Sequence, residues 1–426
     1  MDLFQILAVL LVLTATFGWL NHRYLGLPTT VGLMVIALGV SLLLILVHPL
    51  HPGLERDAAR VLESIDFDRT LLHGLLGFLL FAGALHVDLS DLREHALVIG
   101  VLASVGTILS TAVVGGLAWL LLRVLGIPIP LLDALLFGAL ISPTDPIAVL
   151  AMLTSVGAPR RLETQIAGES LFNDGVGVVL FLALLEMARG GSQGADVAVG
   201  AILELFAREA IGGVLFGLAA GVAAYQLLKR IDSYQIEILI SLALVTGGYA
   251  LADALHLSAP LAMVVAGLLI GNHGRAFAMS DRTREHLDAF WELIDEILNA
   301  VLFVLMGLEI LVLTLRGAYV VAGVVVIPIV LSARFLAVGV PVFVLARFQE
   351  FTPHTVKILT WAGLRGGISV ALALSLRNLA PSASTDVLLV MTYVVVVFSV
   401  VVQGLTMRSV LRHYLATPRT GAGFGA

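Results

Sequence analysis

The chain has 426 residues, of which 59% are hydrophobic and 13% charged, and its mean hydropathy is +1.04. Soluble domains carry about a quarter charged residues, so this composition excludes an ordinary soluble protein and predicts one with lipid as much of its solvent. The net charge of −6 without a long basic block gives no support to a nucleic-acid partner, and the absence of cysteine excludes disulfides and thiolate metal sites.

Segments that could span a membrane follow one another along the whole chain. A spanning helix needs about 20 mostly apolar residues, and thirteen segments qualify: 3–20, 28–48, 69–86, 97–122, 131–155, 163–188, 197–228, 234–254, 257–273, 287–314, 317–346, 354–378 and 385–410. The N-terminal sequence lacks the basic start and cleavage site of a signal peptide, so the first segment is expected to be retained. The distribution of Lys and Arg over the connections predicts a protein of the cell membrane with its N-terminus outside and its C-terminus in the cytoplasm.

The fifth segment contains Ser142-Pro143-Thr144-Asp145-Pro146 in its middle. Each proline lacks an amide donor and disfavours helix before it, so the helix is expected to break here. A break would free carbonyl oxygens beside Asp145, and hard cations prefer oxygen ligands. Two compatible interpretations stay open: Asp145 binds a cation, or it caps the second half-helix, which Ser or Thr does without a charge.

The sixth segment carries two carboxylates, which are costly in a membrane helix unless they face a cavity or a counter-charge. Glu169 and Asn173 are four residues apart, as are Ser170 and Asp174, so each pair shares a helix face. Asp174 begins a long apolar stretch that offers no internal partner, which favours a functional role. For Glu169 a structural polar cluster joining helices is the favoured interpretation, because an arginine elsewhere is available to it, and a functional role is the alternative.

That arginine is Arg365 in the twelfth segment, where three glycines weaken the helix: Gly363, Gly366 and Gly367. Discontinuous helices in corresponding positions of two halves are typical of a transporter's binding site, so the blocks 97–188 and 317–410 are predicted to be two copies of one repeat. Arg365 is expected to neutralise a carboxylate, with Glu169 as its partner; binding a substrate anion is the alternative. The sequence does not decide the partner of Arg334 in the eleventh segment.

In order and spacing, nearly the whole chain resembles the monovalent cation:proton antiporter family 1, the NhaP-like sodium/proton exchangers. The stretches that carry the resemblance are Ser142-Pro143-Thr144-Asp145-Pro146, Gly168-Glu169-Ser170-Leu171-Phe172-Asn173-Asp174-Gly175 and Gly363-Leu364-Arg365-Gly366-Gly367, with weaker agreement in 258–272 and 303–308. Thr-Asp-Pro alone is a weak motif, whereas the combined set is specific.

The resemblance implies an all-α membrane fold of about thirteen transmembrane helices, with inverted repeats and two discontinuous crossing helices, assembled as a homodimer. It also implies a core that moves against a dimerisation scaffold. The expected division places scaffold in 1–96, with the third helix contributing to the core, the two core repeats in 97–189 and 317–413, scaffold helices and a connecting interfacial helix in 190–316, and a short cytoplasmic tail in 414–426. Part of that connection, the polar stretch 281–296, is expected at the membrane interface.

For the ion site, the resemblance implies that Asp174 binds the cation or protons, and that Asp145, the Thr144 carbonyl and Ser170 complete the ligands of a monovalent metal ion. Asn173 would orient its neighbours or replace a second titrating group. An Asn-Asp pair, where a sister branch has two aspartates, suggests electroneutral exchange.

The resemblance implies that Glu169 and Arg365 form the structural ion pair of the family. No cofactor is expected, and the transported Na⁺, K⁺ or Li⁺ and H⁺ are substrates.

One position departs from the family pattern. NhaP-like members often have a glutamate in the third segment, where this chain has Leu80-Phe81-Ala82-Gly83-Ala84-Leu85. If that glutamate normally helps to hold the ion, a site with Ala82 has one negative ligand fewer, and potassium or broad selectivity becomes more plausible.

The sequence therefore predicts a secondary antiporter for pH homeostasis that exchanges Na⁺ or another monovalent cation for H⁺, with both ions competing for Asp174 under alternating access. A proton-coupled transporter of another solute and a cation channel are the rival transport functions. An intramembrane aspartyl protease using Asp145 and Asp174 is the rival enzyme, but no Gly-x-Gly-Asp and no Gly-x-Ser-x-Gly stretch is present, so no enzymatic activity is expected.

Overall fold

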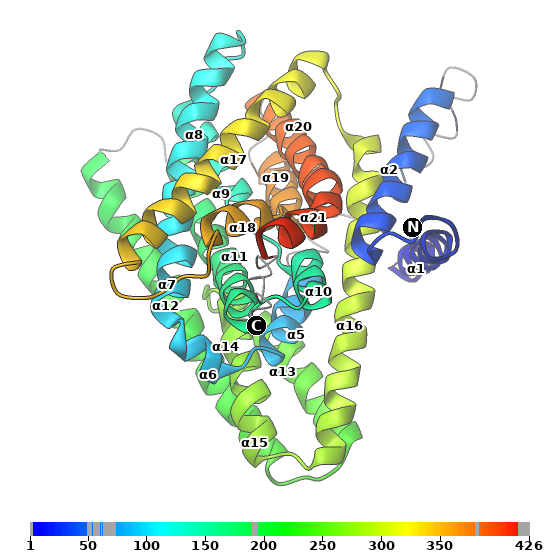
Figure 1. Cartoon of the computed structure of the whole chain (residues 1–426), viewed down its shortest axis with the longest axis vertical. Helices are drawn as coiled ribbons and strands as arrows, with labels where there is room; N and C mark the ends of the chain where they lie inside the picture. The colour runs from blue at the N-terminus through cyan, green and yellow to red at the C-terminus, as the bar shows by residue number, and fades with distance from the viewer. Residues whose placement is uncertain are drawn as a thin grey trace, which may run out of the picture.

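The computed structural model describes residues 3–48, 53, 60, 62, 74–189, 195–379 and 383–415, and each regular element within these residues is a helix (Figure 1). Eight of the helices are long and apolar enough to cross a membrane, and shorter apolar helices accompany them. The predicted all-α membrane fold is therefore confirmed. Residues 69–73 of the third predicted segment and 416–426 of the predicted tail lie outside the described residues.

The helices follow the predicted segments in chain order. The first part of the chain forms α1 (Leu3–Leu20), α2 (Thr29–Val47), α5 (Leu76–Leu85), α6 (Leu89–Glu94), α7 (Ala96–Val101), α8 (Thr107–Val124), α9 (Leu131–Ile141), α10 (Ile147–Val156), α11 (Arg160–Arg189) and α12 (Ala195–Leu228). The second part forms α13 (Tyr234–Ala254), α14 (Ala259–Leu269), α15 (Arg275–Phe277), α16 (Asp281–Leu308), α17 (Gly317–Leu345), α18 (Thr355–Ala362), α19 (Gly367–Leu379), α20 (Ala383–Phe398) and α21 (Gly404–Leu415). Short π-helical turns join α7 to α8, α14 to α15 and α20 to α21, so each of these pairs is one continuous rod.

Two predicted spans are interrupted in the middle. The fifth is divided into α9 and α10, and the twelfth into α18 and α19. The two interruptions touch, because the backbone amide of Asp145 donates a hydrogen bond of 2.8 Å to the carbonyl of Leu364. Prolines interrupt the first helix and glycines the second. Each unwound segment satisfies a polar backbone group of the other. The predicted pair of discontinuous crossing helices is therefore confirmed.

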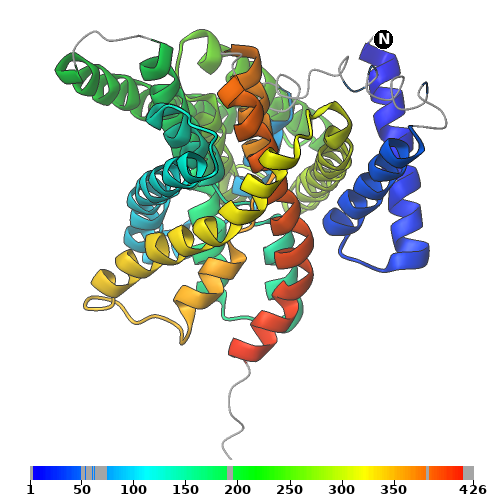
Figure 2. The same ribbon diagram turned by 90° about the horizontal axis from the view of Figure 1, so that it is seen from above.

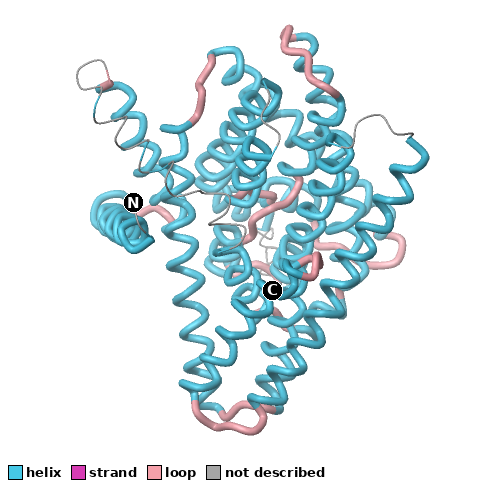
Figure 3. The backbone as a smooth tube through the Cα atoms, turned by 180° about the vertical axis from the view of Figure 1, so that it is seen from behind, coloured by secondary structure: helices cyan, strands magenta, loops and turns pink. Residues whose placement is uncertain are grey.

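Helices from the two predicted repeats surround this crossing. In the first block α8 and α11 pack against α9, and in the second α17 packs against both α18 and α20. Contacts of α8 with α17, and of α9 with α19 and α20, join the blocks into one body. The tube in Figure 3 shows the pink unwound segments lying inside this bundle of helices.

The remaining helices border this body. Helix α14 packs against α5, α12 and α13, and α16 packs against α1, α2, α5 and α13. Seen from above, α1 and α2 form one flank of the molecule (Figure 2). The central crossing is therefore lined on one side by α5 and α16, which come from outside the two repeats.

The polar stretch 281–296 is not a separate connecting helix. It forms the first half of α16, which runs without interruption from Asp281 to Leu308. Ser280 caps its start by accepting a hydrogen bond from the amide of Thr283, and Trp291 is fully buried against Phe81. The buried tryptophan packs the polar half of α16 against α5, while acidic residues such as Glu292 and Glu296 stay exposed.

Candidate functional site

A cavity of about 420 Å³ lies where the crossing meets α5 and α16. It is lined by apolar residues of α5 and by both broken segments. Its polar lining residues are His86 at the end of α5, Thr144 and Asp145 in the first break, Asp174 of α11, Ser369 of α19, and Glu292, Asp295 and Asn299 of α16. Asp145 and Asp174, predicted from different helices, thus open onto one space. Among the residues that line it there are four carboxylates and no lysine or arginine, so the cavity favours cations.

Asp145 sits in the interruption between α9 and α10. Its side chain accepts a hydrogen bond of 2.9 Å from the amide of Ile147, in the first turn of α10, so the capping role predicted from the sequence is present. A Cβ atom at position 366 would overlap the Asp145 carboxylate. Gly366 is therefore the residue that lets the second broken helix approach this side chain.

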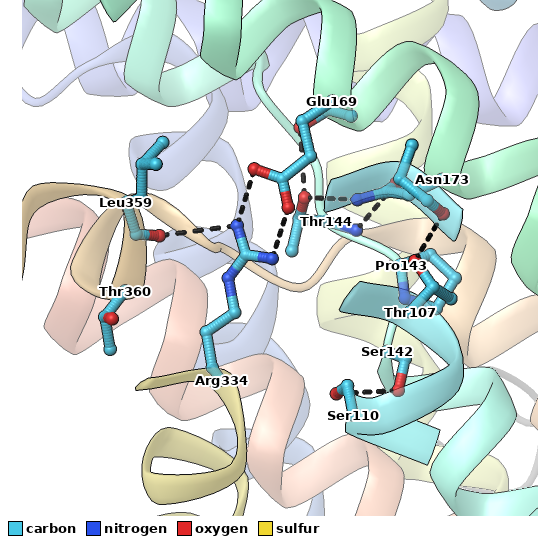
Figure 4. Close-up of polar contacts among 12 residues, drawn as sticks. Thr107, Ser110, Ser142, Pro143, Thr144, Glu169, Asn173, Arg334, Leu359 and Thr360 are labelled. Atoms are coloured by element: carbon cyan, nitrogen blue, oxygen red, sulfur yellow. Dashed lines mark hydrogen bonds and ion pairs between the residues drawn. The ribbon is translucent and has the colours of Figure 1, made fainter. Parts of the chain in front are cut away.

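Thr144, Ser170 and Asn173 form a buried hydrogen-bond network next to the break, and Figure 4 labels Thr144 and Asn173 of this network. The Asn173 amide donates to the Thr144 hydroxyl over 2.9 Å and accepts from the Thr144 backbone amide over 3.3 Å. The hydroxyls of Thr144 and Ser170 are 3.0 Å apart. This network fixes the unwound segment against α11, one residue before Asp174, which is itself only 8% exposed and reaches the cavity.

Arg365 does not have the partner predicted for it, and Arg334, whose partner the sequence left open, takes that place. Glu169 pairs with Arg334 of α17, whose guanidinium donates to both carboxylate oxygens, one of them over 3.0 Å (Figure 4). The expected pairing of Glu169 with Arg365 is therefore wrong. Arg365 instead donates to the carbonyls of Ser142 and Pro143, which the broken helix leaves without helical partners.

Geometry explains this exchange of partners. A guanidinium carries five donors, and unwound backbone at membrane depth needs donors for its carbonyls. Arg365 lies within the break between α18 and α19, and its guanidinium donates to the carbonyls of the first break. Arg334 comes from α17, which packs against α18, and also donates to the Leu359 carbonyl over 3.4 Å.

Asp295 and Asn299 were not predicted as site residues, although both line the cavity. The sequence offered one signal, since their spacing of four places both on one face of a helix. Because the polar stretch around them was assigned to the membrane interface, this helix face was not considered as part of the ion site. Ala82, where the resemblance leads one to expect a glutamate, also lines the cavity and is 1% exposed.

Comparison with known proteins identifies the family. The family model described as sodium/hydrogen exchanger, transmembrane, matches residues 10–413. The chain is a member of the sodium/hydrogen exchanger family. Membership confirms the resemblance and places this exchanger among transporters instead of intramembrane enzymes.

Individual exchangers match over their full length. The Na⁺/H⁺ antiporter NhaP of Pseudomonas aeruginosa is 48% identical over 417 residues, covering 97% of each chain. The Na⁺/H⁺ antiporter NhaH of Halobacillus dabanensis is 35% identical over 394 residues, covering 90% of this chain and 91% of its own. The structure of the sodium proton antiporter MjNhaP1 from Methanocaldococcus jannaschii at pH 8 superposes with a TM-score of 0.74 at 19% identity, covering 98% of this chain and 100% of its own, and so supports the fold.

Proposed function

We propose that this exchanger moves Na⁺ against H⁺ by letting both ions compete for Asp174. The observation that carries the proposal is that Asp174 and Asp145 open onto one cavity beside the unwound Thr144 segment. Two full-length relatives are named Na⁺/H⁺ antiporters. The carboxylates, the Thr144 carbonyl and the Ser170 hydroxyl supply the oxygen ligands that a hard monovalent cation prefers.

Competition at one carboxylate couples the two ions. An empty, charged Asp174 is costly to carry through a low-dielectric environment, whereas a bound proton or a bound cation neutralises it. If the core reorients only when this charge is cancelled, each reorientation carries either a cation or a proton. The core does not reorient with an empty site. Asn173 is neutral beside Asp174, so one charge is exchanged for one and the cycle is electroneutral.

The Glu169–Arg334 pair and Arg365 have a structural role in this proposal. They hold α11, α17 and the two broken helices together, so that the ligands move as one unit. The moving core comprises the repeats 97–189 and 317–413, and the scaffold comprises 1–96 and 190–316. The exchanger works as a homodimer in the cell membrane, with its N-terminus outside, and serves pH homeostasis.

Potassium or broad cation selectivity is a second candidate, favoured by one residue. Ala82 lines the cavity where NhaP-like exchangers often carry a glutamate. A site with fewer negative ligands binds cations less selectively, because dehydration of the smaller ion is less well compensated. Comparison of Na⁺, K⁺ and Li⁺ in one assay separates the two candidates.

Asp174→Asn is the variant that tests the proposal. Purified exchanger in acid-loaded vesicles with a pH-sensitive dye is expected to alkalinise the lumen when Na⁺ is added outside, and Asp174→Asn is expected to abolish this flux. Asp253→Asn is the matched control, because Asp253 is an exposed aspartate of α13 outside the cavity lining, and this variant is expected to exchange normally. Normal exchange by Asp174→Asn would refute the proposal, and a steady cation current without proton movement would indicate a channel instead.

A further inference from the structure

One face of α16 borders the cavity, and the function proposed above assigns it no task. Glu292, Asp295 and Asn299 are spaced by three and four residues, so they lie on the same side of the helix. All three line the cavity together with Asp145 and Asp174. Their exposure falls along the helix, since Glu292 is exposed, Asp295 is partly buried and Asn299 is only 2% exposed. The row therefore leads from solvent towards the buried carboxylates.

Asn299 is the unusual member of this row. Neither its amide oxygen nor its amide nitrogen makes a hydrogen bond of good geometry within the described residues, although the Asp295 carboxylate, one turn earlier, lies close enough to interact with it. A buried amide without a partner costs about 1–3 kcal/mol, so native structures usually satisfy such groups. The side chain borders both this cavity and the cleft between α16, α1, α2 and α10, so water or a hydrated ion in either space lies near it.

The charges around the cavity indicate which kind of ligand this is. Asp295, Asp145 and Asp174 border one space. Carboxylates gathered around a space whose lining contains no lysine or arginine are stabilised, when ionised, by a cation between them. Carboxylate and amide oxygens are hard ligands, and the cavity has room for roughly ten water molecules, so the ion can keep part of its hydration shell.

We propose that Asp295 and Asn299 form an accessory binding position for the transported monovalent cation, facing the Asp174 and Asp145 carboxylates across the cavity. The inference rests on the proposed function and adds a second cation-binding position to it. The ion is first held, partly hydrated, at α16 and then passes to Asp174. Since α16 lies outside the two repeats, this position does not travel with Asp174 when the core reorients. It therefore raises apparent cation affinity without being needed for the exchange step.

Asp295→Asn in the vesicle assay tests this accessory position. We expect the external Na⁺ concentration for half-maximal exchange to rise about tenfold, with a maximal rate within about twofold of the unchanged protein. Glu296→Gln is the matched control. It removes the same charge from the next residue of α16. Glu296 borders the cleft with α1, α2 and α10, as Asp295 and Asn299 also do, but only Asp295 and Asn299 line the Asp174 cavity as well. Its half-maximal concentration is expected to stay unchanged.

A second variant and a second measurement separate binding from folding and from transport. Asn299→Ala is expected to raise the half-maximal Na⁺ concentration as well. In the double variant with Asp295→Asn, this concentration is expected to be close to that of either single variant, because the two residues hold one ion. In purified protein, thermal stabilisation by Na⁺ is expected to need about tenfold more Na⁺ in Asp295→Asn. This readout does not depend on proton exchange, so loss of exchange in the unchanged protein would refute the proposed function but not the accessory position.

Three results would overturn the accessory position. The first is an unchanged half-maximal Na⁺ concentration in Asp295→Asn. The second is an equal rise in Glu296→Gln, which would indicate a general effect of charge on α16. The third is a lower melting temperature and maximal rate in Asp295→Asn at unchanged half-maximal concentration, which would assign Asp295 a structural role only.

Discussion

Glu169 and Arg334 form an ion pair that is withdrawn from water on both sides, with side chains 2% and 7% exposed. Two charges in such surroundings are tolerated only as a pair, because each alone would bear the full cost of desolvation. The pair links α11, which carries Asp174, to α17 of the other repeat. Its contribution is therefore to the assembly of the site, while Asp174 and Asp145 contribute the free charge.

Glu169→Gln is expected to destabilise the fold strongly. Removing one partner of a buried pair leaves an uncompensated charge and typically costs about 3–5 kcal/mol. We expect a clearly lower melting temperature of the purified exchanger, and partial recovery when Arg334 is also replaced by Gln. The exposed pair of Arg284 with Asp281 supplies the control, since Asp281 is 96% exposed and Asp281→Asn should cost less than about 1 kcal/mol. Equal melting temperatures for the two single variants would contradict this role.

The two broken helices depend on each other. Asp145 and Leu364 share a backbone hydrogen bond, Arg365 donates to carbonyls of the first break, and Gly366 leaves room for the Asp145 side chain. Unwound backbone at membrane depth is stable only where protein satisfies its polar groups, and here each break does this for the other. The crossing is thus a structural unit made from segments about 220 residues apart.

Gly366→Ala tests this unit. The added methyl group would overlap the Asp145 carboxylate, so either that side chain or the second break must shift. A displacement of this size in a binding site is expected to reduce exchange at least about tenfold, while the helical content remains unchanged. Gly247→Ala is the control, because a Cβ atom there meets no neighbour within 4 Å. Wild-type exchange by Gly366→Ala would show that the close approach is dispensable.

Much of this arrangement could be predicted from the sequence, because prolines, glycines and carboxylates in apolar segments violate strong rules of membrane structure. The breaks around Asp145 and Arg365 follow from such violations. The partner of Glu169 could not be predicted in the same way, since two arginines were available and the choice depends on how α17 crosses α11. Asp295 was missed because a polar half-helix is read as interfacial unless a buried anchor such as Trp291 is known.

Considered as a whole, the molecule places the proposed ion ligands Asp145 and Asp174 in the break between α9 and α10 and on α11, and a second acidic row on α16. The repeats form a connected body through α8, α9, α17 and α20, whereas α16 packs against α1, α2 and α5. Alternating access needs a division into a moving and a fixed part, because a binding site that moves must slide along a part of the protein that stays in place. In the proposed mechanism, cation and proton meet Asp174 in the cavity between them.

The dependence of Na⁺ affinity on pH tests the competition at Asp174 most directly. For two ions that exclude each other at one carboxylate, the Na⁺ concentration for half-maximal exchange rises up to about tenfold for each unit by which pH falls, once protons occupy most sites, while the maximal rate at saturating Na⁺ stays constant. We expect this pattern when exchange is measured over a grid of Na⁺ concentrations and equal pH on both sides of the vesicle. A half-maximal concentration that does not change with pH, together with a falling maximal rate, would contradict a shared site.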